Sequence, residues 1–267
     1  MMITAGVDLG STYVKAAVIR DGKRIGHGVA PTGHDHDLTS RRVLDEAVRM
    51  AGIDRNDIEY IISTGYGRRV TTLADENISE ISANARGVQW IGSELGVRTI
   101  IDIGGQDTKV IALDDDLQMI NFAMNDKCAA GTGRFLEVLA KVLDIPLSEM
   151  GPLSLTSRDP IDITTTCLVF AKSEVANLIF EGHRKEDIIM GIHKAVARRL
   201  VAMAKKVGIR DVVFFDGGPA RNTGMIIAME KELGRKMHVP GNPQIVTATG
   251  AAILAMEHLE KKGGGRT

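Results

Sequence analysis

Short apolar runs alternate with longer amphipathic stretches along most of this 267-residue chain. The short runs are rich in Ile and Val and end at Gly, Asp or Asn, which is typical of β-strands. The expected strands are Ile3–Leu9, Val14–Arg20, Ile58–Ser63, Thr99–Ile103, Lys109–Leu113, Met119–Met124 and Asp211–Phe215.

The longer stretches place apolar residues three or four positions apart, which is helical spacing. The expected helices are Arg41–Ala51, Glu80–Leu95, Gly133–Leu143, Phe170–Glu181, Lys185–Val207, Thr223–Leu233 and Thr247–Lys261. Strands that alternate with helices in this way predict an α/β fold.

Both halves of the chain begin with the same local pattern. Val7–Lys15 aligns without a gap on Ile101–Lys109, and in each segment an aspartate ends one strand, glycine follows and a lysine enters the next strand. We interpret the match as a duplication that gives two similar α/β domains facing each other across a cleft. The first is expected over residues 1–98, with the helix of residues 247–261 packing back on it. The second, residues 99–246, carries both cysteines.

Glycine-rich turns follow three of the expected strands. Asp8 and Asp102 precede two of these turns, and Gly217-Gly218 forms the third. Glycine lets backbone N–H groups approach phosphate oxygens, and a carboxylate holds Mg²⁺ directly or through its waters. One such turn alone is more simply an aspartate-capped turn, but three across both halves favour nucleotide binding. The chain lacks Gly-x-x-x-x-Gly-Lys-Ser/Thr and a Gly-x-Gly-x-x-Gly after its first strand, which argues against P-loop and dinucleotide folds.

Composition and charge mainly exclude functions. The net charge of -1 gives no electrostatic footprint for nucleic acid or an anionic membrane. No apolar run is long enough to span a bilayer, and the first residues lack the pattern of a signal peptide. We therefore expect a cytoplasmic protein without a structural disulfide.

The chain has two cysteines, and each comes shortly before an expected helix. Cys128 precedes Gly133–Leu143, and Cys167 precedes Phe170–Glu181. Helix N-termini stabilise thiolates and the anionic clusters that thiolates hold. Two thiolates are half of a four-cysteine iron–sulfur site, which a symmetric dimer would complete. A Cys₄ zinc site and two buried thiols that act as small apolar residues are the alternatives.

The three glycine turns resemble the motifs of a known superfamily. Asp8–Thr12, Asp102–Gly105 and Gly217-Gly218 are similar to the two phosphate motifs and the adenosine motif of actin, sugar kinases and heat-shock chaperone ATPases. The resemblance implies two duplicated actin-like (ribonuclease H-like) ATPase domains around a nucleotide cleft.

A second resemblance covers nearly the whole chain. Asn125–Leu136 is similar to the signature of the 2-hydroxyacyl-CoA dehydratase activators and of the ATP-binding subunits of benzoyl-CoA reductase. Three further segments share the similarity: Ser63–Arg68, Asp102–Asp107 and Thr166–Glu174. It implies a homodimer with one [4Fe–4S] cluster, ligated by Cys128 and Cys167 of each subunit. It also implies that ATP hydrolysis drives a low-potential electron to a partner iron–sulfur enzyme, with reduced ferredoxin or flavodoxin as the expected donor.

We assign roles to individual residues on this basis. Asp8 and Asp102 would hold Mg²⁺ through water, and Gln106 would orient the attacking water or act as an ordinary turn residue. Lys15 would reach a phosphate, and Glu137 would approach the nucleotide, although a salt-bridged role is the simpler one for it. The expected ATP or ADP contacts are Gly10, Ser11, Thr12, Lys15, Gly104, Gly105, Gly131, Thr132, Gly133, Glu137, Gly217, Gly218, Asn222 and Gln244.

Two other functions stay open at this stage. One is a small-molecule, sugar-type kinase of the same superfamily, which would need a sugar-binding carboxylate and no cluster. The other is a non-enzymatic actin- or chaperone-like ATP switch. The electron acceptor also stays open between a 2-hydroxyacyl-CoA dehydratase, a benzoyl-CoA reductase and a double-cubane-cluster protein.

Overall fold

The chain forms two compact units in the computed structural model, which describes residues 2–165 and 167–263. The first unit comprises Met1–Val97 and Gln244–Thr267, and the second comprises Arg98–Pro243. Thr166, which belongs to one of the resembling segments, lies outside the described residues. No helix in the described ranges is both long and apolar enough to cross a bilayer.

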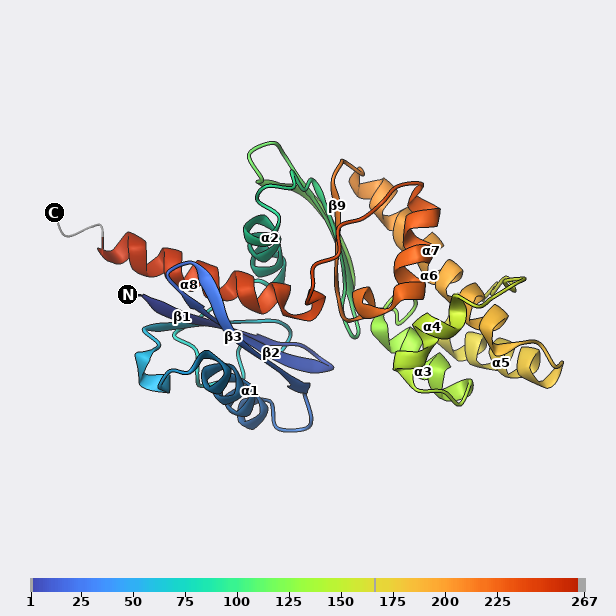
Figure 1. Ribbon diagram of the computed structural model, residues 1–267, viewed down its shortest axis with the longest axis horizontal. Coiled ribbons are helices and arrows are strands. Elements are labelled where there is room, and N and C mark those ends of the chain that lie inside the picture. The colour runs from blue at the N-terminus through green and yellow to red at the C-terminus, as the bar shows by residue number, and fades with distance from the viewer. Residues whose placement is uncertain (1, 166, 264–267) are drawn as a thin grey trace. The chain divides into compact units, whose positions relative to one another are not determined.

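The first unit is a five-stranded sheet with helices on both faces (Figure 1). Its strand order is β3-β2-β1-β4-β5, formed by Lys23–Pro31, Tyr13–Arg20, Ile3–Leu9, Tyr60–Thr64 and Glu76–Asn77. Helix α1 (His36–Ala51) packs on β1, β2 and β3. Helices α8 (Val246–Gly263) and α2 (Glu80–Ile91) pack on each other, with α8 against β1, β2 and β4. β1 is buried over its whole length, because both faces are covered.

Glycines let helix α8 approach its neighbours closely. A Cβ added to Gly250 would overlap the carbonyl oxygen of Ala83 in α2, and one added to Gly6 in β1 would overlap the carbonyl oxygen of Ala248. The absence of a side chain at these positions therefore sets the distance between α8, α2 and the sheet.

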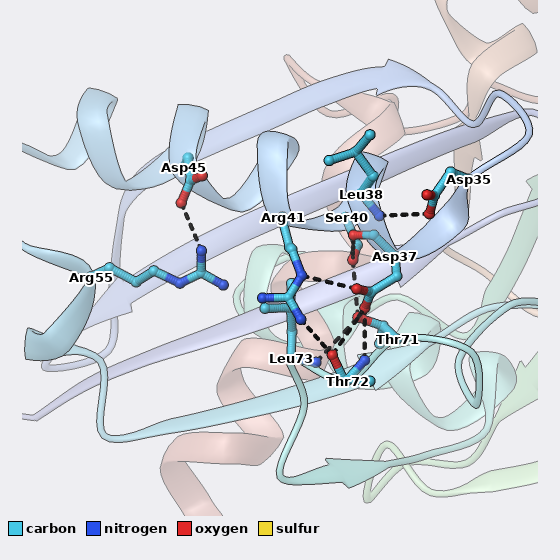
Figure 2. Close-up of polar contacts among 10 residues, drawn as sticks. All are labelled: Asp35, Asp37, Leu38, Ser40, Arg41, Asp45, Arg55, Thr71, Thr72 and Leu73. Carbon is cyan, nitrogen blue, oxygen red and sulfur yellow. Dashed lines mark hydrogen bonds and ion pairs between the residues drawn. The ribbon is translucent and has the colours of Figure 1, made fainter.

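A polar cluster fixes the segment after β4 onto the start of α1 (Figure 2). The Asp37 carboxylate accepts hydrogen bonds from the Thr72 backbone N–H at 2.8 Å, from the Thr71 hydroxyl at 3.1 Å and from Arg41 Nε at 2.9 Å. The Thr72 backbone bond and the Arg41 guanidinium lower the pKa of Asp37 to about 2. The Asp37 carboxylate therefore stays ionised at every ordinary pH.

The second unit is a four-stranded sheet of order β8-β7-β6-β9. These strands are Met119–Asn125, Thr108–Leu113, Thr99–Ile103 and Val213–Gly217. Its helices are α3 (Gly133–Val142), α4 (Met150–Ser154), α5 (Leu168–Phe180), α6 (Lys185–Val207) and α7 (Thr223–Leu233). Figure 1 shows them on one side of the sheet, and the largest apolar cluster of the chain lies between sheet and helices.

The two sheets repeat the same local register. In β1 and β2, Asp8 lies opposite Lys15, and in β6 and β7, Asp102 lies opposite Lys109. The strand that carries the aspartate also has a parallel neighbour in each unit, β4 beside β1 and β9 beside β6, and this neighbour extends as far as the aspartate. The gap-free alignment of the two halves is thus also an alignment of their strand pairs, as a duplication predicts.

All seven strands and all seven helices expected from the sequence are present, with ends shifted by a few residues. The expected list of helices and strands did not include β3, the two-residue β5, the five-residue α4 or the four 3₁₀ turns at Arg55–Asp57, Leu147–Glu149, Gly218–Arg221 and Pro243–Ile245. The two-residue β5, α4 and the 3₁₀ turns are too short to show a period. β3 has nine residues, but Gly26 and Gly28 interrupt its apolar pattern.

Gly250→Ala should destabilise the first unit. The new methyl group has no space beside Ala83, so α8 must move away from α2, at a cost of roughly 1–3 kcal/mol in the free energy of unfolding. Urea unfolding monitored by circular dichroism measures the change. Gly241→Ala is the matched control, since no atom lies within 4 Å of a Cβ there. Equal stabilities of the two variants would contradict the close packing of α8.

Candidate functional site

The first candidate phosphate turn begins at Asp8, at the carboxyl end of β1. Asp8 is 2% exposed, and its Oδ2 accepts a hydrogen bond from Lys15 Nζ at 2.8 Å. Its Oδ1 is buried and has no hydrogen-bond partner among the described residues. Gly65, after β4, lies so close that an added Cβ would overlap Asp8 Oδ1. The fold therefore holds this second carboxylate oxygen in place with its acceptor capacity unused among the described residues.

The residue that follows β3 fixes the backbone of the same turn. Thr32 Oγ1 donates to the Gly10 carbonyl at 2.8 Å, and the Thr32 backbone N–H donates to the Thr12 carbonyl at 3.0 Å. Gly10, Ser11 and Thr12 are all partly exposed. The turn thus combines a rigid backbone with accessible residues, as a phosphate-binding turn requires.

The second turn repeats the ion pair and adds a carboxylate. Lys109 has no exposed surface, and its Nζ lies 3.3 Å from Asp102 Oδ2 and 2.8 Å from Asp107 Oδ2. We expected Lys15 to reach a phosphate, and the structure places its ammonium on Asp8. Lys109 and Asp107 were missing from the predicted site, although the alignment of the halves had already paired Lys109 with Lys15.

The start of α3 is bonded directly to this second turn. The Gly133 N–H donates to the Gly104 carbonyl at 2.9 Å, and the Arg134 N–H donates to the Gly105 carbonyl at 2.8 Å. Gly131 has a φ of 86°, and its carbonyl accepts from Thr108 Oγ1 at 2.6 Å. The structure therefore brings Gly104, Gly105 and the 131–133 segment together. Gln106 is exposed at the tip of the turn.

The third turn joins the second at the same end of the sheet. β9 runs parallel to β6 with Asp216 beside Asp102, and Asp216 is 1% exposed. Gly217 has a φ of 84°, and its Cα faces Asp102 Oδ1 and the Ile103 carbonyl so closely that a Cβ would overlap both. Only glycine fits there, so the phosphate turn and the turn after β9 are packed as one unit.

Asn222 and Glu137, two of the predicted contacts, use side-chain polar atoms within the protein. Asn222 caps α7 by accepting from the Met225 N–H at 3.0 Å. Glu137 pairs with Arg134 at 3.0 Å and Lys141 at 3.1 Å. Burial by itself would raise the pKa of Glu137, but these two hydrogen bonds together hold it below its ordinary value. Gln244 is half-buried and engaged in the Pro243–Ile245 turn that precedes α8, in the first unit.

Both cysteines are free thiols in the second unit. Cys167 is exposed and is the N-cap residue of α5, as expected. Cys128 precedes α3, which starts at Gly133 as expected, but it lies in the loop after β8, four residues before the N-cap Thr132, and so is not at the helix end itself. Helix α3 nevertheless packs against α5.

One internal side chain holds each cysteine segment. Asn125 Nδ2 donates to the Cys128 carbonyl at 2.8 Å and to the Ala130 carbonyl at 3.2 Å. Glu174, in the second turn of α5, accepts from the Thr164 and Thr165 backbone N–H groups at 2.9 and 3.0 Å. Within the described part of the chain, no three His, Cys, Asp or Glu side chains are placed to share one metal ion.

A buried histidine adjoins the third turn and was not predicted as functional. His193 in α6 is 0% exposed, and its Nε2 lies 3.1 Å from Asn222 Nδ2. Burial lowers the pKa of His193 from 6.5 to about 3, so the ring is neutral at ordinary pH. A histidine among apolar residues of a long helix gives no signal beyond that of a core position.

His193 should make the stability of the second unit depend on pH. Its folded pKa lies below its unfolded value of 6.5, so its contribution is present above pH 6.5 and is lost as the pH falls. Between pH 6.5 and 5 the wild type should lose roughly 1.5 kcal/mol more unfolding free energy than His193→Gln. Urea titrations at both values measure this. His183→Gln, at an exposed histidine, is the control and should follow the wild type; parallel curves for wild type and His193→Gln would contradict it.

Known proteins resemble this chain over nearly its whole length. Residues 5–255 match the model of the BadF/BadG/BcrA/BcrD ATPase family. The 2-hydroxyisocaproyl-CoA dehydratase activator of Clostridioides difficile is 43% identical over 266 residues, 97% of each chain. The solved structure of such an activator from Clostridium difficile, with bound ADPNP, has 42% identity and a TM-score of 0.94, and the match covers 100% of this chain and 98% of that one.

A more distant neighbour shares the fold alone. The ROK family glucokinase of Streptomyces griseus is 14% identical, with a TM-score of 0.57 over 96% of this chain and 99% of its own. The expected actin-like α/β ATPase fold and the resemblance to dehydratase activators are both confirmed. The chain belongs to the BadF/BadG/BcrA/BcrD ATPase family.

Proposed function

We propose that this chain is an ATP-dependent reductive activator. As a homodimer it would couple ATP hydrolysis to the transfer of one low-potential electron to a partner iron–sulfur enzyme. Its family and its 43% identity to a dehydratase activator support this proposal. The observation that carries it is the direct bonding of the phosphate turn to the helix that follows Cys128.

In the second unit, the Asp102 and Gly217 turns would bind the nucleotide, and in the first unit the Asp8 turn would bind hydrated Mg²⁺. The buried Oδ1 of Asp8, which has no hydrogen-bond partner in the described part of the chain, fits a water of hydrated Mg²⁺, since Mg²⁺ keeps several waters and accepts oxygen ligands. Bound Mg²⁺ would neutralise charge on the phosphates. Gln106 is exposed and has the amide needed to orient an attacking water.

The cysteines fit a cluster that two chains share. Cys128 is half-buried, Cys167 is exposed, and both thiols are free. No other His, Cys, Asp or Glu among the described residues completes a metal site with them, so a [4Fe–4S] cluster would take two thiolates from each of two subunits. When bound, the cluster would supply one-electron transfer.

The chain's own bonds offer a route from nucleotide to cysteines. Gly104 and Gly105 accept from the first two N–H groups of α3, so a shift of the turn on phosphate binding must move the start of α3. Cys128 lies five residues before that start, and α3 packs against α5, which Cys167 begins. Nucleotide binding would thus change the geometry at both thiols.

The partner would be a 2-hydroxyacyl-CoA dehydratase. The name of the 43% identical relative supports this choice over a benzoyl-CoA reductase or a double-cubane-cluster protein. Reduced ferredoxin or flavodoxin would be the donor. A pull-down under anaerobic conditions with an ATP-transition-state mimic identifies the acceptor.

Asp8→Asn and Asp102→Asn should each lower ATP turnover by roughly 100-fold or more, because an amide cannot hold the hydrated cation or balance its lysine. A coupled phosphate-release assay measures the rate. Asp45→Asn, at an exposed pair with Arg55, should retain wild-type turnover. Normal hydrolysis in both site variants would exclude this ATP site.

Cys128→Ser and Cys167→Ser should each abolish iron binding while leaving ATP binding intact, since a thiolate of the cluster is lost from each subunit. Iron analysis and EPR after anaerobic purification measure the cluster, and sedimentation measures the dimer. Ser173→Ala, at an exposed position of α5, is the control. Bound zinc, or an iron-free protein with sugar-dependent ATP consumption, would favour the zinc-site or kinase alternative.

A further inference from the structure

His193 occupies a site built from three helices of the second unit. A Cβ added to Gly224 in α7 would lie 2.8 Å from His193 Nδ1 and would overlap Ser154 Oγ in α4. One added to Gly151 in α4 would lie 2.9 Å from Asn222 Oδ1. Glycines therefore let α4, α6 and α7 close around the imidazole and the Asn222 amide.

The hydrogen bonds of Asn222 determine the proton position on His193. Asn222 Oδ1 accepts from the Met225 N–H, so the amide group that faces His193 Nε2 is the NH₂ donor. His193 Nε2 must then be an acceptor, and the neutral ring carries its proton on Nδ1. Nδ1 is buried with no hydrogen-bond partner among the described residues. Nε2 therefore serves as a hydrogen-bond acceptor, although the N–H at Nδ1 has no hydrogen-bond partner among the described residues.

Asn222 joins two elements that border the proposed nucleotide site. Its backbone N–H donates to the Pro219 carbonyl at 3.0 Å and ends the Gly218–Arg221 turn, while its side chain begins α7. The other end of that turn is Gly217, which packs on Asp102. The orientation of the Asn222 amide therefore fixes the far end of a turn whose near end lies at the phosphate turn.

We propose that His193 is a positioning residue for nucleotide binding, which holds the Asn222 amide, and with it the 217–221 turn, through the acceptor lone pair on Nε2. This inference rests on the proposed ATP site. His193 acts through Asn222 and does not itself contact the nucleotide. This role requires only a hydrogen-bond acceptor facing the Asn222 NH₂ group. Another residue whose acceptor reaches the same point should therefore substitute for His193.

The test compares two substitutions of nearly equal length. His193→Gln keeps an acceptor oxygen near the position of Nε2, and His193→Met removes it. Loss of one buried hydrogen bond should raise the KM for ATP roughly five- to tenfold in His193→Met, with kcat within about twofold of wild type. His193→Gln should stay within about twofold of wild type in both constants. His183→Gln is the control for loss of an imidazole at the surface.

Each outcome decides between the inference and the function on which it rests. Calorimetry of ATP binding to the wild type comes first, and a wild type that does not bind ATP overturns the proposed function and this inference together. If the wild type binds ATP, a folded His193→Met with unchanged KM, or a His193→Gln as impaired as His193→Met, overturns the inference alone.

NMR of the wild-type imidazole gives a second readout if His193→Met does not fold. The ¹⁵N resonances should show an unprotonated Nε2 and a protonated Nδ1, and the Nε2 resonance should shift when ADPNP is added. The opposite tautomer, or an Nε2 resonance unchanged at saturating nucleotide, would overturn the inference.

Discussion

The candidate site of each unit depends on one buried ion pair between an aspartate at the end of a strand and a lysine directly opposite on the antiparallel neighbour. Asp8 pairs with Lys15, and Asp102 pairs with Lys109. Removing one partner of a buried pair typically costs about 3–5 kcal/mol, because the remaining charge is left uncompensated. The pair therefore fixes the strand register. It also fixes the glycine turn between the two residues, since the chain must reverse direction within a few positions.

The two copies of this pair are not equivalent. Asp8 meets one ammonium and keeps a buried oxygen without a partner among the described residues, whereas Lys109 is shared by Asp102 and Asp107. An ammonium that two carboxylates hold, as Asp102 and Asp107 hold Lys109, has little capacity left for a phosphate. The two halves thus share one geometry, and Asp107 distinguishes the second turn, which also makes the backbone contact with α3.

The sequence predicted what depends on local spacing. The presence of each strand, the glycine turns and the equivalence of Asp8 and Asp102 follow from patterns within about ten residues, and these expectations agree with the structure. The predictions were weaker where a side chain's role depends on distant segments. Cys128 and Cys167 both precede helices in sequence, yet only Cys167 starts one, because the loop after β8 is held by Asn125 before α3 begins.

Lys109 and His193 show the same limit. Lys109 was visible in the alignment of the halves, but its burial between two carboxylates comes from the turn geometry that places Asp107 beside it. His193 meets Asn222 across 29 residues of sequence, and nothing local to α6 indicates an acceptor role. Such polar contacts can be identified only from the fold. A hydrogen bond between residues far apart in the chain leaves no repeating pattern in the sequence.

The turn after β6 and the turn after β9 are bonded to the helices in different ways. The difference determines which turn could transmit a ligand-induced movement to a helix. Gly104 and Gly105 are bonded to α3 through backbone groups alone, at 2.9 and 2.8 Å. The 217–221 turn is tied to α6 through two side chains, Asn222 and His193. Backbone bonds at a helix start transmit a displacement, since the helix moves as a rigid body. Side-chain bonds inside a packed core resist displacement, since their rotamers are fixed by neighbours. Because Gly217 packs on Asp102 and the Ile103 carbonyl, the 217–221 turn also holds the near end of the phosphate turn. On the proposed function, nucleotide state would therefore reach α3 through Gly104 and Gly105, which follow that fixed end.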